Sequence, residues 1–229
     1  MSDVARAGDA VERWTARINR LVEGIARHWL FIFNAVWAVF IGLAFLAPVL
    51  MNAGAVGPAN VIYKVYGLTC HQLPERSVFL FGHEHFYTSQ ALAAGGHLPA
   101  DMNQLQRILM RWAGSAEAGW KVALCQRDVA IYASVFLSGL LFGALRPRLL
   151  RRGPLPKMKL WMLALLLAPA AVDGLTQLPG WRESVPALRF FTGALAGAAG
   201  VWAAYPHIDE AMADAARPLN GNRARIGQP

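Results

Sequence analysis

Charged residues are scarce in this chain. Only 16 % of its 229 residues are Asp, Glu, Lys or Arg, while 55 % are apolar. This balance is too apolar for a soluble domain and is typical of a membrane protein. The 21 Gly and 13 Pro, together with long uncharged runs, exclude a coiled coil, a disordered tail and a nucleic-acid module. We therefore attribute the net charge of +8 to membrane topology and predict no nucleic-acid partner.

Cysteine and the common catalytic motifs are also rare or missing. The chain has 2 Cys, Cys70 and Cys125, and no Cys-x-x-Cys or His-Glu-x-x-His spacing. It has no Walker, kinase, phosphatase or rhomboid motif, and no internal repeat of the kind that transporters use. The sequence alone therefore leaves open whether the protein is an enzyme.

Long apolar runs, in contrast, are abundant. They predict an all-α, polytopic membrane protein, with transmembrane helices at about residues 29–51, 128–146, 160–178 and 186–206. These four spans define a membrane domain over residues 29–206.

The flanking segments follow a different pattern. Apolar residues spaced by three and four predict an amphipathic cytoplasmic helix over residues 1–28, which either lies on the membrane surface or extends the first span. A long outer loop with short interfacial helices contains an insertion at 82–124, and residues 207–229 form a cytoplasmic tail.

Basic residues give the orientation. Residues 146 to 159 hold six Lys or Arg and no acid, so this segment is expected to face the cytoplasm. With four spans, both termini are then cytoplasmic. We predict a multi-pass protein in the lipid bilayer of a prokaryotic cytoplasmic (inner) membrane.

Polar residues that are unusual next to a membrane come from four separate stretches, and all four fall at the outer ends of the predicted spans. Because they share one end, we expect a common polar site at the outer membrane boundary. They are Cys70, His71, Gln72 and Arg76; Cys125, Arg127 and Asp128; Asp173, Thr176 and Gln177; and Arg182 to Arg189.

These stretches carry a resemblance. The runs that begin at Cys70-His71-Gln72, Cys125-Gln126-Arg127 and Asp173-Gly174-Leu175 resemble, in order and local spacing, the prokaryotic membrane-protein family catalogued as domain of unknown function 2085. The resemblance covers roughly residues 60 to 205 and implies a shared membrane fold and a candidate site. This chain differs from the family by a link about 40 residues longer between Phe81 and Cys125, and by Asp128 where many members carry Cys.

Three interpretations of Cys70 and Cys125 stay open. Both are predicted to lie outside, where a disulfide between them would be stable. They could instead be thiolate ligands, with His71, of a transition metal such as zinc, and His83 or His85 could complete the set. A redox-active thiol is the third interpretation.

Asp173 and the arginines suggest ligand chemistry. A carboxylate inside a transmembrane helix costs about 2.5–3.5 kcal/mol at the centre, so Asp173 is expected either to pair with an arginine or to act, with His71, as a catalytic candidate. Guanidinium groups bind carboxylate and phosphate. The predicted set for an anionic lipid-like or quinone-like ligand is Arg76, Arg127, Arg182 and Arg189, with Gln72 and Gln177.

Three functions are compatible with this pattern. The protein is a binder or enzyme acting on a metal or an anionic ligand, a non-catalytic accessory subunit of a larger membrane complex, or a thiol-redox membrane protein. Other membrane subunits are partners only in the second case.

Overall fold

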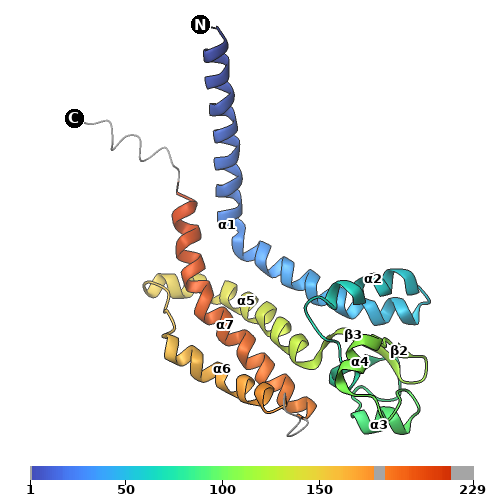
Figure 1. Ribbon diagram of the computed structural model, residues 1–229. Coiled ribbons are helices and arrows are strands. Elements are labelled where there is room, and N and C mark those ends of the chain that lie inside the picture. Colours follow the sequence, from blue (N-terminus) through green and yellow to red (C-terminus); the bar gives the residue numbers. More distant parts are fainter. Residues whose placement is uncertain (1, 178–183, 218–229) are drawn as a thin grey trace.

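The computed structural model describes residues 2–177 and 184–217 (Figure 1). Its longest element is helix α1 (Ser2–Asn52), which changes direction partway along in Figure 1. The predicted amphipathic segment and the first span are therefore parts of one continuous helix. Residues 25–29, where the two parts meet, include neither Gly nor Pro.

Three further long helices lie side by side, with α7 (Pro186–Ala215) packed against both α5 (Gln126–Arg152) and α6 (Leu160–Leu175) (Figure 1). Small residues allow α5 and α7 to approach closely. A Cβ atom on Gly197 would lie 2.3 Å from the Ile131 carbonyl oxygen, and one on Gly193 would lie 2.6 Å from that of Arg127.

Three helices in the described part of the chain are long and apolar enough to cross a membrane: Val11–Asn52, Gln126–Arg152 and Pro186–Ala215. This confirms the membrane class. Helix α6 has 16 residues and, at about 1.5 Å per residue, is shorter than a hydrocarbon core of about 30 Å. The prediction of four spans is therefore not confirmed: three helices are long enough to cross, and α6 is a shorter apolar helix.

The prediction of a purely α-helical protein needs a correction. The segment between α1 and α5 contains a three-stranded antiparallel sheet, in which β3 (Gly119–Cys125) lies between β1 (Ser77–Leu80) and β2 (Gly114–Ser115). Pairing of Ser77 with Cys125 places the end of β3 beside the Cys70 loop. The strands are too short for an alternating pattern to stand out in the sequence.

Short helices complete this segment, which we call the sheet region. They are α2 (Val56–Tyr66), the 3₁₀ helix η1 (Pro74–Arg76), α3 (Ser89–Ala94) and α4 (Gln104–Met110). The N-cap of α4 is Asn103, whose side chain accepts from the Gln106 backbone while the Gln106 side chain accepts from the Asn103 backbone.

Two clusters of buried residues hold the molecule together. One joins the end of α1 and helix α2 to β3, with Ala47, Tyr66 and Leu124 among its members. The other surrounds Trp29 and Phe142 between α1, α5 and α7. The first cluster fixes the sheet region against the helix bundle, so residues of both parts can form one site.

Candidate functional site

A cavity of about 340 Å³ lies where α5 and α7 begin and α6 has just ended. It brings together predicted site residues from the sheet region, from helices α5 and α7, and from the residues just after α6. The predicted residues that line it are Cys70, His71, Gln72, Arg76, Cys125, Arg127, Gln177 and Arg189, together with Asp128.

The two cysteines meet at one side of this cavity. The Cys125 backbone N–H donates to Cys70 Sγ over 3.3 Å, and both thiols are free. The predicted proximity of the cysteines is therefore confirmed. Asp128, in the first turn of α5, is the third member, because the ligand atoms of Cys70, Cys125 and Asp128 all lie within 4.8 Å of one another.

Crowding of these groups disfavours a free thiolate. The hydrogen bond with Cys125, burial, and the nearby Cys125 and Asp128 charges all raise the pKa of the Cys70 thiol. Two thiols and one carboxylate are nevertheless ligands that zinc prefers. A cation among them would favour their deprotonated forms.

The Cys70 loop is held from behind by a buried lysine. Lys121 is 1 % exposed, and its Nζ donates to the Gln72 carbonyl oxygen over 2.6 Å. Burial lowers the pKa of Lys121 to about 8, although the Cys70 and Glu75 charges oppose this shift. Gln72 itself has the left-handed φ of 51°, and its side-chain amide donates to the Tyr63 carbonyl oxygen over 2.9 Å. That amide group therefore helps to fix the loop.

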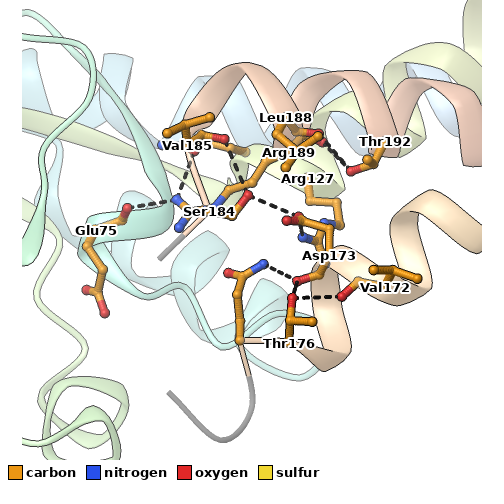
Figure 2. A network of polar contacts seen from close by, with 12 residues as sticks. Glu75, Arg127, Val172, Asp173, Thr176, Ser184, Val185, Leu188, Arg189 and Thr192 are labelled. Atoms are coloured by element: carbon orange, nitrogen blue, oxygen red, sulfur yellow. Dashed lines mark hydrogen bonds and ion pairs between the residues drawn. The ribbon is translucent and has the colours of Figure 1, made fainter. Parts of the chain in front are cut away.

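Asp173 lies behind the cavity, where it is 2 % exposed. Arg127 Nη2 donates to its Oδ2 atom, and Ser184 Oγ donates to the same oxygen over 3.1 Å (Figure 2). Gln177 Nε2 donates to the Asp173 backbone oxygen over 2.5 Å. The predicted pairing of Asp173 with an arginine is confirmed, and the partner is Arg127.

Arg189 reaches the cavity from the second turn of α7. It is 5 % exposed, and its Nη1 donates to the Glu75 carbonyl oxygen over 3.0 Å and to Gln126 Oε1 over 3.1 Å (Figure 2). Within the described ranges, the Nε atoms of Arg127 and Arg189 have no hydrogen-bond partner. Glu75 forms an ion pair with Arg107 at 3.4 Å, which ties α4 to the site.

The remaining predicted residues are three histidines and Arg182. His71 is exposed and lines this cavity, as well as a second one of about 160 Å³. It is not part of the group formed by Cys70, Cys125 and Asp128, and His83 and His85 do not line the first cavity as the described residues form it. Arg182 lies outside the described residues.

The sequence did not predict the roles of two residues of the site, Asp128 beside the two cysteines and Lys121 behind the Cys70 loop. The sequence placed Asp128 among the polar residues of the site but not among the metal ligands, although it follows Cys125 by three residues. That spacing was the available signal. Lys121 gave none, because a single lysine in a short apolar stretch indicates no particular partner.

These features define a largely helical membrane protein with a polar cavity at one end of its bundle. Residues 116–203 match the family described as "Predicted membrane protein (DUF2085)". The resemblance inferred from the motifs is thus confirmed over this segment, which includes Cys125, Asp173 and Arg189 but not Cys70.

One curated relative can be compared over a longer stretch. The uncharacterised protein MJ1492 of Methanocaldococcus jannaschii is 32 % identical over 136 residues, which are 59 % of this chain and 61 % of the relative. This chain therefore aligns with about three fifths of that protein. No solved structure matches the chain.

Proposed function

We propose that this protein binds a transition metal ion, such as zinc, through Cys70, Cys125 and Asp128 at the outer boundary of a prokaryotic cytoplasmic membrane. The observation that carries the proposal is the convergence of the three groups within 4.8 Å from the Cys70 loop, the end of β3 and the first turn of α5. Residues 55 positions apart in sequence meet here, and their chemistry suits one cation.

The number of ligands suggests how such a metal would work. Catalytic zinc sites have three protein ligands and leave a fourth position for water or substrate, whereas structural sites fill all four. His71 lines the same cavity and is exposed, so it can either complete the site or exchange protons with a bound molecule. In the second case the metal keeps an accessible position, and the protein is a binder or an enzyme.

The orientation is part of the same proposal. The basic segment of residues 146 to 159 comprises the last turns of α5 and the link to α6, at the opposite end of these helices from the cavity. With that segment in the cytoplasm, the cavity faces outward, and if α6 crosses the membrane both termini are cytoplasmic. Impermeant labelling of single cysteines in a Cys-free background should mark position 83 on intact cells and leave position 150 unlabelled.

Metal analysis of the purified protein tests the central claim. We expect about one zinc-like ion per chain, and at least tenfold weaker binding after Asp128→Asn or Cys125→Ser, because each removes one of three ligands. Asp101→Asn is the matched control, since Asp101 is an exposed acid in the sheet region. A metal-free wild-type protein would contradict the proposal.

A thiol-redox function is the second candidate, because one observation favours it: both thiols are free and adjacent. A redox pair would cycle between dithiol and disulfide and would not need Asp128. Mass spectrometry of protein alkylated under native conditions separates the two candidates. Reversible disulfide formation that Asp128→Asn leaves unchanged would favour redox chemistry over metal binding.

A further inference from the structure

We propose that the arginine-lined cavity binds a phosphate group, either of a phospholipid head group or of free phosphate, beside the metal position. This phosphate site adjoins the proposed metal site. It rests on the proposed function in one respect, because the bound metal would neutralise the charge of Asp128. The residues that carry it are different ones, namely Arg76, Arg127 and Arg189.

Arg189 is the strongest reason to expect an anion. Its side chain is 5 % exposed, yet both of its hydrogen-bond acceptors, the Glu75 carbonyl and the Gln126 side-chain amide, are uncharged. In the ranges that the structure describes, no carboxylate forms an ion pair with Arg189, and its Nε atom has no hydrogen-bond partner. The nearby Asp173 carboxylate is already paired with Arg127, and burying a guanidinium without an ion pair of its own is costly, so a bound anion would supply the missing charge.

The surroundings of Arg189 add positive potential. The half-buried Arg76 lines the cavity, and so does Arg127, whose Nη2 is paired with Asp173 but whose buried Nε has no hydrogen-bond partner among the described residues. Helices α5 and α7 both begin at the cavity, and helix N-termini favour anions. Asp128 is the one carboxylate in the lining that the described residues form, and metal binding would occupy it.

The geometry favours phosphate over a carboxylate. One guanidinium satisfies a carboxylate through two parallel hydrogen bonds, whereas three guanidiniums from η1, α5 and α7 suit the oxygens of a tetrahedral, more highly charged group. A volume of about 340 Å³ is in the range of small-molecule sites, and its position at the ends of apolar helices is that of lipid head groups.

Calorimetric titration of the zinc-loaded protein in a neutral detergent tests this inference. The probes are inorganic phosphate, dihexanoyl phosphatidic acid and, as a carboxylate, acetate. We expect one or both phosphate probes to bind, and Arg76→Gln to weaken that binding by tenfold or more, because a charge-assisted contact is lost. Arg189→Lys, which keeps the charge but loses the planar donors, should also weaken it, while the control Arg148→Gln at the other end of α5 should not.

Zinc content, measured on each sample, keeps the two proposals separable. Binding of phosphatidic acid alone would identify a lipid head group, and equal or tighter binding of free phosphate would identify a soluble ligand; both support the site. Equal affinity in wild type and Arg76→Gln, equal binding of acetate, or no binding to a zinc-loaded protein would overturn it. A zinc-free protein that still binds phosphate through Arg76 would refute only the metal proposal.

Discussion

The ion pair between Asp173 and Arg127 lies at the end of the helix bundle that supports the cavity. Removing this pair is the most specific test of how that end of the bundle is stabilised. Asp173 comes from α6 and Arg127 from α5, and the Arg127 side chain is 23 % exposed, so the pair is largely removed from solvent. Replacing Asp173 with Ala would leave the Arg127 guanidinium half-buried without its carboxylate, and Ser184 Oγ without its acceptor.

Removal of one partner from a buried pair costs about 3–5 kcal/mol. Because Arg127 retains some access to solvent, we expect the free energy of unfolding to fall by about 2–4 kcal/mol after Asp173→Ala. Asp173→Asn should cost less, since an amide can still accept from Ser184. The measurement is equilibrium unfolding in mixed detergent micelles.

A double-mutant cycle with Arg127→Gln then isolates the pair itself, and we expect a coupling of about 1–3 kcal/mol. The pair between Lys157 and Glu210 is the control, because its side chains are 47 % and 62 % exposed and solvent screens such a pair. Additive effects of Asp173→Ala and Arg127→Gln, with no coupling above that of the control pair, would refute the reasoning.

Three further predictions concern other parts of the molecule. Gly197→Ala should destabilise the fold by about 1–3 kcal/mol, because the new Cβ would clash with the Ile131 carbonyl of α5. Gly200→Ala is the control: a Cβ there meets nothing within 4 Å, so this variant should be neutral or slightly stabilising. Thermal unfolding compares the two variants. Asp209→Ala should lower the unfolding free energy by about 2 kcal/mol and shift Trp29 fluorescence, because Asp209 accepts from Trp29 at 3.2 Å and from Arg146 at 2.7 Å. Lys121 has a pKa of about 8 in the fold, below its usual 10.5, so the unfolded chain binds more protons than the folded chain between these pH values. The free energy of unfolding should therefore rise with pH from about 8 to 10.5. Lys121→Met should abolish that rise, and an unchanged pH profile in the variant would contradict the prediction.

The sequence predicted the convergence of the site well for a simple reason. Helices that cross a bilayer place their ends at two depths only, so Arg127, Asp173 and Arg189 had to share one end once the spans were assigned. The partner of Asp173 followed from the cost of an unpaired carboxylate in such a helix. Neither inference needed the loops.

The sheet region was less predictable, because its short strands are defined by partners distant in sequence. Ser77 pairs with Cys125 across 48 positions of chain, a contact that no local pattern encodes. The group that the structure brings together also differs in one member from the predicted ligand set: His71 is adjacent to Cys70 in sequence, but Asp128 is the residue that the start of α5 brings close to it. Adjacent residues point in different directions, so proximity in sequence was the weaker guide.

The position of Asp173 favours one of its two predicted roles over the other. Its carboxylate is 2 % exposed, receives Arg127 and Ser184, and does not line the cavity that the described residues form. A group held in this way orients Arg127 toward the cavity but has no path for exchanging protons with a molecule bound there. His71, which is exposed and lines the cavity beside Cys70, does have that path. We therefore infer that Asp173 is a positioning residue and that any proton transfer in the cavity involves His71, so His71→Gln should alter the pH dependence of ligand binding while Asp173→Asn should alter its affinity.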